Sequence, residues 1–264
     1  MSEQLSIRRS DGVQIWEMGF GAVNAIDPVF LDALDGARRA AAADDSVAVV
    51  VLRSSLKVFS AGADAKWMAG IVKEKGAPAL LEEFNTTMDS FRELCAAMRR
   101  TPILFVAAIG GHALAGGLEL AAACDLRFAA DDDAIRIGAP EMDLFGAMPS
   151  GGGGAQFLAR LMGPSRALRF ILEAKPLSPH AAYAAGIIDE LVDAASLIER
   201  TEQFASETAR KAGRIGVAAA KRAILTGAEL PLGEALDFDR SIHWDAMRRG
   251  NFLAGVNAFV ERFG

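Results

Sequence analysis

Two glutamates, Glu119 and Glu141, stand beside glycine-rich segments with spacings that could support acid–base chemistry. Glu119 lies in GGHALAGGLELAAACD, residues 110–125, three positions after Gly116. A helix should begin near Gly116, where backbone N–H groups lack intrahelical partners and the helix dipole adds partial positive charge. Because small residues let a ligand approach closely, the stretch could hold an anion beside a carboxylate. The alternative is tight helix packing, with Glu119 as an ordinary first-turn acid.

Glu141 follows Pro140 in IGAPEMDLFGAMPSGGGGAQFL, residues 137–158, and a helix should begin near the glycine run. A carboxylate on a rigid Pro-Glu turn is better positioned as an acid or a base than one on a mobile loop. The alternative is an ordinary solvated glutamate on a surface loop.

A third segment, FSAGAD at residues 59–64, places small residues where a strand should pass into a helix. It could present a bare N–H at Ala63, as the first segment does at Gly116. Two such donors aimed at one oxygen form an oxyanion hole, which stabilises charge that develops on a carbonyl. The alternative is a plain connection between strand and helix.

Motifs for several other chemistries are absent or broken. The glycines at 19 and 21 do not continue into G-x-G-x-x-G, no G-x-x-x-x-G-K-[ST] occurs, and no serine stands in G-x-S-x-G. The histidines and cysteines are too scattered to indicate a metal site or a disulfide framework: His112, His180, His243, Cys95 and Cys124. We therefore expect no metal, nicotinamide or flavin site.

The composition is that of an ordinary globular protein. The chain has 264 residues, 52% of them hydrophobic, and a net charge of -6, which argues against nucleic acid as a partner. Its apolar runs are interrupted by glycines, His112 and Glu119, so no membrane span is predicted. The first residues lack the apolar run of a signal peptide. With cysteines that form no motif, this favours a cytoplasmic protein.

Short β-rich runs alternate with helical patterns in the first half of the chain, which indicates an α/β sheet covered by helices. Strands are expected at residues 6–10, 13–18, 47–54, 103–109 and 126–130. Asp27 and Pro28 should cap and open the first long helix. Residues 64–100 have a helical pattern with a break at 74–78, and from about residue 155 onward the pattern stays helical. No internal repeat is apparent.

The three segments, in this order, resemble those of the crotonase superfamily, which contains enoyl-CoA hydratases and isomerases. The family pattern is similar to F-x-A-G-A-D-x-K-x-M, then N-G-x-A-x-G-G-G-x-E-L-A-x-x-C-D, then F-x-x-P-E-x-x-x-G-x-x-P-G-x-G-G-T-Q-x-L. This chain has FSAGADAKWM, GGHALAGGLELAAACD and IGAPEMDLFGAMPSGGGGAQFL. VNAI at residues 23–26 and NAFVERF at 257–263 extend the likeness over nearly the whole chain.

The resemblance implies an α/β fold with a crotonase-like spiral β-β-α core. The core with its acyl-CoA site would span residues 1–200, and a C-terminal helical trimerisation region would span residues 201–264. Homotrimers or dimers of trimers would follow. The substrate would be an acyl-CoA thioester, so coenzyme A would arrive as part of the substrate and no separate cofactor is expected.

The resemblance also assigns site residues by position. Ala63 and Gly116 would supply the two oxyanion-hole N–H groups, and Glu119 and Glu141 match the paired carboxylates. In hydratases of the family these carboxylates hold and activate the water that adds across the α,β double bond, but the residues alone do not say which is acid and which is base. Contacts to the CoA part would fall on five residues, mostly through their backbone: Ala22, Ala61, Asp64, Ala65 and Lys66.

We therefore interpret the chain as an enoyl-CoA hydratase of fatty acid metabolism. A Δ3,Δ2-enoyl-CoA isomerase, an acyl-CoA hydrolase or decarboxylase, and a noncatalytic acyl-CoA binder remain alternatives. Departures from the family pattern predict an unusual acyl pocket. The segment from Ala63 to Pro102 is longer than in short-chain hydratases, Trp67 replaces a polar residue, and PSGGGGAQ at residues 149–156 should loosen the loop beside Glu141.

Overall fold

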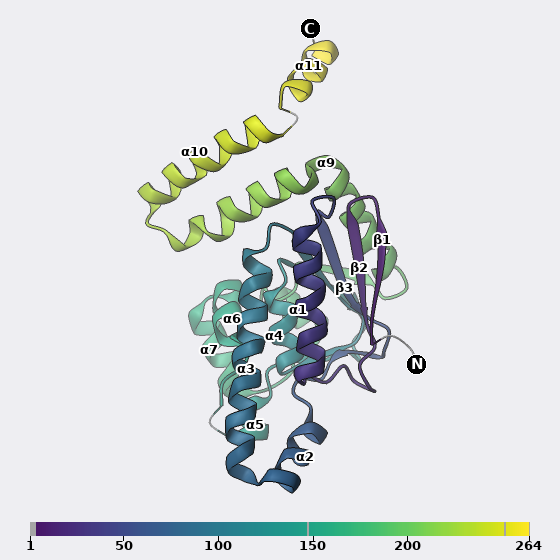
Figure 1. The fold of residues 1–264 in the computed structure, drawn as a ribbon, viewed down its shortest axis with the longest axis vertical. Helices are drawn as coiled ribbons and strands as arrows, with labels where there is room; N and C mark the ends of the chain where they lie inside the picture. Colours follow the sequence, from purple (N-terminus) through teal and green to yellow (C-terminus); the bar gives the residue numbers. More distant parts are fainter. Residues whose placement is uncertain (1–3, 147, 251, 264) are drawn as a thin grey trace.

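The computed structural model describes residues 4–146, 148–250 and 252–263, which form two sheets surrounded by helices (Figure 1). The larger sheet has the strand order β1-β2-β3-β5-β7-β9, and the smaller has the order β4-β6-β8. β1 pairs antiparallel with β2, and the other neighbours pair in parallel. The strands are β1 (Leu5–Ser10), β2 (Val13–Met18), β3 (Val49–Ser54), β4 (Val58–Ser60), β5 (Leu104–Ile109), β6 (His112–Leu114), β7 (Leu126–Asp131), β8 (Ile137–Gly138) and β9 (Glu190–Asp193).

Each of three successive turns of the chain adds one strand to each sheet before a helical segment. β3 and β4 lead into α2 (Ala65–Lys75) and α3 (Ala77–Arg100), and β5 and β6 lead into α4 (Gly116–Ala123). β7 and β8 lead into α5 (Glu141–Phe145). This arrangement confirms the predicted spiral β-β-α core. The three turns repeat the same pattern of strand pairing. This pattern requires only that the strands of each turn be similarly buried, so the structural repeat has no matching repeat in the sequence.

Local sequence signals set the helix ends where they were expected. Asp27 accepts a hydrogen bond from Phe30 N at 2.8 Å, and Pro28 opens α1 (Pro28–Ala43). Gly76, at φ 86°, separates α2 from α3 within the predicted break. Large side chains from both strands and helices fill the core, among them Trp16, Phe30, Phe59, Phe91 and Phe105, each less than 2% exposed. Burial of each such side chain contributes roughly 1.5–3 kcal/mol.

The prediction that the chain stays helical after residue 155 was wrong at β9 (Glu190–Asp193). β9 pairs with β7, and Asp189 just before it accepts hydrogen bonds from Arg127 N and Arg127 Nη2 at 2.8 and 2.6 Å. So short a strand shows too little periodicity to be separated from a helix, and tertiary contacts specify it. The neighbouring helices were predicted correctly: α6 (Gly154–Met162), α7 (Pro164–Glu173) and α8 (Pro179–Ala184).

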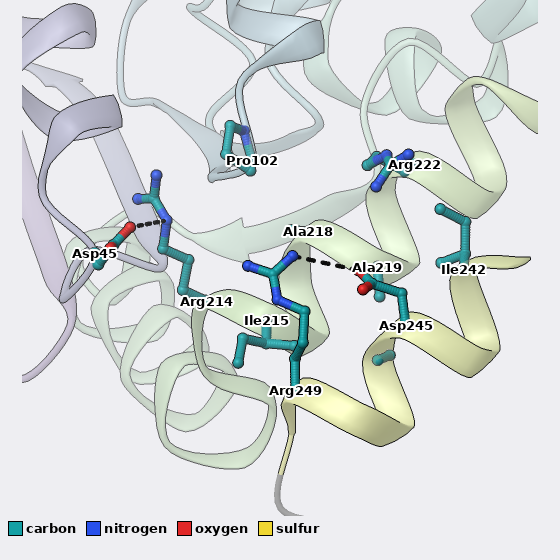
Figure 2. Close-up of a pocket in the computed structure, with 11 residues that line it drawn as sticks. Asp45, Pro102, Arg214, Ile215, Ala218, Ala219, Arg222, Ile242, Asp245 and Arg249 are labelled. Carbon is teal, nitrogen blue, oxygen red and sulfur yellow. Dashed lines mark hydrogen bonds and ion pairs between the residues drawn. The ribbon is translucent and has the colours of Figure 1, made fainter.

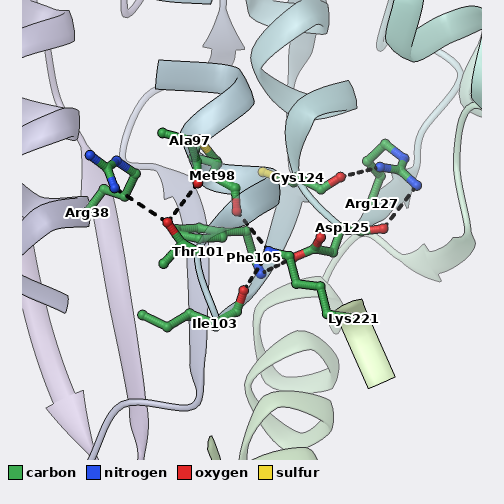
Figure 3. A network of polar contacts seen from close by, with 10 residues as sticks. All are labelled: Arg38, Ala97, Met98, Thr101, Ile103, Phe105, Cys124, Asp125, Arg127 and Lys221. Carbon is green, nitrogen blue, oxygen red and sulfur yellow. Dashed lines mark hydrogen bonds and ion pairs between the residues drawn. The ribbon is translucent and has the colours of Figure 1, made fainter. Parts of the chain in front are cut away.

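The long helix α9 (Leu197–Leu225) bends at Gly213, where φ is 57° and ψ is -174°. Beyond the bend, the buried Lys221 Nζ donates to three oxygens at 2.8 Å each: Met98 O, Ile103 O and Asp125 Oδ2 (Figure 3). These bonds fix the second half of α9 against the last turn of α3, the chain just before β5 and the residue just before β7. The proposed division at residue 200 falls inside α9 and stays a prediction.

Helices α10 (Leu232–Arg249) and α11 (Phe252–Phe263) form the C-terminal helical region, and α11 stands away from the body of the molecule (Figure 1). Large apolar side chains of α11 are exposed: Phe252, Leu253, Val256, Phe259 and Val260. Within the described ranges, no helix combines the length and the apolar character needed to cross a membrane.

Candidate active site

The two segments predicted to form an oxyanion hole lie against each other. Ala63 is joined to Ile26 by a parallel β-bridge. Gly62, at φ +88°, comes so close to α4 that an added Cβ would lie 2.7 Å from Ala115 Cβ and 3.0 Å from Gly116 N. Only glycine permits this approach, since it has no Cβ and adopts this φ without strain.

The N–H groups of Ala63 and Gly116 have no acceptor among the residues that the structure describes. Gly116 is the first residue of α4, so its N–H precedes the intrahelical hydrogen bonds. Ala115 before it has φ 51° and ψ -128°, and such a conformation costs a non-glycine residue about 1–3 kcal/mol. Ala63 and Gly116 line one cavity, so the structure brings the two turns together. Their donation to a thioester oxygen stays a prediction.

Other glycines of the segment serve packing. At Gly117 an added Cβ would lie 2.2 Å from Ser60 O, and at Gly111 it would lie 2.2 Å from Lys57 O. α4 and the start of β6 therefore press directly on the backbone around β4. The packing interpretation of this stretch is therefore correct at Gly111 and Gly117, while anion binding at the free N–H of Gly116 stays a prediction.

Glu119 faces the same cavity from the first turn of α4 and is 4% exposed. Its Oε1 accepts a hydrogen bond from Gly151 N at 3.1 Å, and its Oε2 accepts one from Gly154 N at 2.6 Å. Burial raises the pKa of Glu119, and these N–H donors oppose the rise because they stabilise the charged form. The glycine run that was expected to loosen the loop beside Glu141 is therefore tied to Glu119.

Glu141 opens α5 directly after Pro140, and its side chain is 3% exposed. The alternative of a solvated surface glutamate is therefore wrong. Neither carboxylate oxygen has a hydrogen-bond partner among the described residues. Burial raises the pKa of Glu141 to about 7, and the charge of Glu119 adds to the rise.

The two carboxyls form an unequal pair in one cavity. Two like charges in an apolar site do not ionise together readily, so the first ionisation belongs to the pair as a whole. The N–H donors of Gly151 and Gly154 favour the negative charge on Glu119. The proton then rests on Glu141, whose oxygens lack such donors in the described structure. At neutral pH the pair thus offers one base and one acid.

Apolar side chains complete the cavity, whose open volume is about 20 Å³. They come mainly from α3 and from the α5 segment: Ile26, Phe84, Met88, Phe91, Phe145 and Met148. Sequence reasoning missed this wall, although residues 84, 88 and 91 have the spacing of one helix face. An apolar wall around two carboxyls and two free N–H groups strengthens the electrostatic interactions inside.

The residues predicted to contact CoA lie at the outer edge of this site. Ala61 N donates to Val23 O at 3.1 Å, which places the segment around residue 22 beside the segment 61–66. Asp64 is half-buried, and its carboxylate caps the N-terminus of α2, so this side chain stabilises the helix. The other four are exposed: Ala22, Ala61, Ala65 and Lys66. Their contact with CoA stays a prediction.

A larger cavity, about 280 Å³, lies where β3 and β5 begin, between α9, α10 and the loops before these strands (Figure 2). Four of its charged groups form two ion pairs, since Arg214 lies 3.6 Å from Asp45 and Arg249 lies 3.3 Å from Asp245. The remaining charged group, Arg222, lies over the ring of Phe238. The smaller cavity, by contrast, contains a buried acid without a partner in the described structure. Chemistry, rather than size, identifies the smaller cavity as the candidate active site.

The histidines take part in local contacts. His112 Nδ1 accepts a hydrogen bond from Arg136 N at 3.0 Å, and His180 Nε2 lies 2.9 Å from Asp131 Oδ1. Over residues 4–146, 148–250 and 252–263, no group of three or more His, Cys, Asp or Glu side chains is arranged to hold a metal ion.

Known proteins share this sequence pattern and fold. The family model described as enoyl-CoA hydratase/isomerase matches residues 12–264. A probable enoyl-CoA hydratase of Mycobacterium leprae is 32% identical over 241 residues, which are 91% of this chain and 88% of that protein. The 2,3-dehydroadipyl-CoA hydratase of Escherichia coli is 32% identical over 241 residues, 91% of this chain and 89% of that protein. The crystal structure of an enoyl-CoA hydratase from Bacillus anthracis has a TM-score of 0.89 at 27% identity, covering 98% of this chain and 97% of that chain.

Proposed function

Because the chain belongs to the enoyl-CoA hydratase/isomerase family, we propose that it is an enoyl-CoA hydratase, which adds water across the α,β double bond of an enoyl-CoA thioester. One observation carries this proposal: Glu119 and Glu141 share a cavity with the free N–H groups of Ala63 and Gly116. Addition of water requires a base for the water, an acid for Cα and stabilisation of the thioester oxygen. Moving a proton between Cα and Cγ requires only one carboxyl, which would leave the second unexplained.

The oxyanion hole would act on the charge that develops as water attacks Cβ. Negative charge then accumulates on the thioester oxygen, and the N–H groups of Ala63 and Gly116 would donate to it. One such donor contributes roughly 2.7–4 kcal/mol to lowering the barrier. The bridge to Ile26 and the tight contact at Gly62 fix both donors before substrate arrives, so little reorganisation is needed.

The unequal carboxyl pair would divide the proton transfers. Glu119 would accept a proton from water while the water oxygen bonds to Cβ, and Glu141 would give its proton to Cα. The double bond is thereby replaced by a C–O and a C–H bond, with Glu119 protonated and Glu141 ionised. Transfer of one proton from Glu119 to Glu141 restores the starting state.

The CoA part of the substrate would lie along the outer edge of the site. Ala22, Ala61 and Ala65 would contact it through their backbone, and the exposed Lys66 would offer a cation to a phosphate. CoA would enter and leave as part of the thioester, and we propose no separate cofactor.

Assembly and location are also proposals. We propose a homotrimer or a dimer of trimers that works in the cytoplasm, in fatty acid metabolism. The exposed apolar side chains of α11 support assembly, since Leu253 is 76% exposed and Phe259 is 64% exposed. Cys95 and Cys124 are both free and buried, which fits a reducing compartment. Light scattering of the purified protein tests the assembly.

A steady-state assay tests the hydratase function. Crotonyl-CoA and other enoyl-CoAs should lose their conjugated-enoyl absorbance and yield 3-hydroxyacyl-CoA. Faster turnover of a 3-enoyl-CoA than of crotonyl-CoA would indicate an isomerase instead, and release of free CoA thiol would indicate a hydrolase. Tight binding of acyl-CoA without turnover would leave only the binding function.

A further inference from the structure

The apolar wall of the active-site cavity has a composition that points to one class of acyl group. We propose that the site takes short, uncharged enoyl groups, and that Met88 of α3 and Phe145 of α5 form the wall that excludes longer chains. This inference rests on the hydratase function proposed above and names its substrate class.

Space is the first argument. The open volume between the donors, the two carboxyls and the apolar wall is about 20 Å³. The reacting water and the first acyl carbons fill such a cavity, so each further methylene must displace a wall side chain.

The wall is also firmly backed, which limits how far it can give way. Met88 lies over the glycine loop, where a Cβ added at Gly151 would be 2.4 Å from its Sδ. Phe91 lies over the next residue, where a Cβ added at Gly152 would be 2.3 Å from its ring. α3 therefore packs directly on the loop that holds Glu119, and it cannot shift to admit a longer chain without disturbing that carboxylate.

A second contact braces α3 on its other side. The ring of Phe84 stacks on Trp67 of α2, with ring centroids 6.5 Å apart and an interplanar angle of 28°. Trp67 is the residue that departs from the polar type usual in the family. Figure 1 shows α2, the start of α3 and α5 at the same end of the molecule. Trp67, which departs from the family pattern, therefore holds the apolar wall in place and does not open a channel.

Charge is the last argument. Among the described residues that line the cavity, Glu119 and Glu141 are the only charged ones, and none carries a positive charge. An acyl group that ends in a carboxylate would place a third negative charge in an apolar site without a cation to pair with it. We therefore expect this chain to differ in substrate from its relative named 2,3-dehydroadipyl-CoA hydratase.

The test compares acyl groups in the full-length protein. Hydration rates are measured for crotonyl-CoA, dec-2-enoyl-CoA and 2,3-dehydroadipyl-CoA, and titration calorimetry measures binding of the unreactive pair hexanoyl-CoA and adipyl-CoA. The wild type should prefer crotonyl-CoA over each other enoyl substrate by at least about 10-fold in kcat/KM. Hexanoyl-CoA should bind at least about 10-fold more tightly than adipyl-CoA, which has the same length and one added carboxylate.

Two variants with matched controls test the wall itself. Met88→Ala and Phe145→Ala should each raise the ratio of decenoyl to crotonyl kcat/KM by about 10-fold or more. Met88→Leu keeps the volume, and Leu144→Ala alters the exposed neighbour of Phe145 outside the lining, so both should leave the ratio unchanged. Phe145 is half-exposed, so its variant should fold even if Met88→Ala does not.

The outcomes separate this inference from the hydratase proposal. Efficient hydration of decenoyl-CoA or of 2,3-dehydroadipyl-CoA by the wild type overturns the inference and leaves the hydratase function standing. Absence of hydration with every enoyl-CoA overturns the hydratase function. In that case equal binding of hexanoyl-CoA and adipyl-CoA overturns the charge argument as well, and tighter binding of hexanoyl-CoA supports it.

Discussion

The segments that carry Glu119 and Glu141 place the same side chain in two different environments. Glu119, on α4, is buried and accepts hydrogen bonds from Gly151 N and Gly154 N. Glu141, on α5, is equally buried but has no partner for either oxygen in the described structure. Burial alone would raise the pKa of both, so the difference in hydrogen bonding decides which one carries the charge.

This difference arises from a loop that belongs to neither helix. Gly154 can approach Glu119 only because it lacks a side chain, since a Cβ added there would lie 2.5 Å from Glu119 Cγ. A Cβ added at Gly151 would instead lie 2.4 Å from Met88 Sδ. One fold therefore obtains an acid and a base from two glutamates by bringing bare backbone to only one of them.

The largest expected effect comes from removing either carboxyl. Glu119→Gln and Glu141→Gln should each lower kcat for crotonyl-CoA hydration by about 10²–10⁴-fold, because each loses one proton transfer. Asp143→Asn serves as the control, since Asp143 is an exposed acid on the same short helix as Glu141. Near wild-type activity in either glutamine variant would remove that residue from the mechanism.

Loss of one oxyanion donor should have the next largest effect on kcat/KM. This effect should not depend on which of the two proton transfers limits the rate. Ala63→Pro removes the free N–H. The residue before it is Gly62, and glycine tolerates a following proline. We expect kcat/KM to fall by about 10²–10³-fold. Ala63→Ser keeps the N–H and should stay within a few-fold of wild type. Equal activity of the two variants, both folded by circular dichroism, would contradict the proposed oxyanion hole.

A smaller effect on kcat should follow when the hydrogen bonding of the two carboxyls is made more alike. Gly154→Ala forces the loop away from Glu119 and weakens the hydrogen bond of 2.6 Å. Because displacement by about 1 Å can cost up to 10²-fold, we expect kcat to fall by about 10–10²-fold. Gly36→Ala is a matched control, since its added Cβ meets no atom within 4 Å. If both variants have wild-type kcat, the loop does not position Glu119.

The smallest expected effect is on stability, and its sign should differ between the two glutamates. Glu119→Gln leaves one buried N–H facing an amide NH₂ group and should lower the free energy of unfolding by about 1–3 kcal/mol. Glu141→Gln removes an unpartnered carboxyl and should raise it by about 1–3 kcal/mol at pH 8. Urea unfolding of both variants and wild type provides the values.

The gain in the free energy of unfolding that we expect for Glu141→Gln should depend on pH, because the pKa of Glu141 is raised. The folded protein binds a proton at Glu141 up to a pH of about 7, whereas the unfolded chain releases it near the ordinary glutamate value of 4.5. The contribution of Glu141 to the free energy of unfolding of the wild type therefore falls as the pH rises between these two values. The advantage of Glu141→Gln should grow from pH 5 to pH 8, and a constant or shrinking advantage would contradict the raised pKa.

Much of this arrangement was accessible from the sequence. The cap at Asp27 and the break at residues 74–78 follow from local signals. The order of the three segments carried the family resemblance, and that resemblance implied the spiral core and the roles of Ala63, Gly116, Glu119 and Glu141. The pairing of β9 with β7, the wall that includes Met88, and the bonds from Gly151 and Gly154 to Glu119 were not predicted. Each depends on residues far apart in the chain, and composition around either partner does not reveal the contact.

Infrared difference spectroscopy at about pH 6 tests the unequal pair most directly, because protonated and ionised carboxyls absorb at separate frequencies. The spectrum of wild type minus Glu141→Gln should show the loss of a protonated carboxyl, which follows from its pKa of about 7. The spectrum of wild type minus Glu119→Gln should show the loss of an ionised carboxylate. The reverse assignment, or two carboxyls in the same state, would contradict the division of acid and base between Glu141 and Glu119.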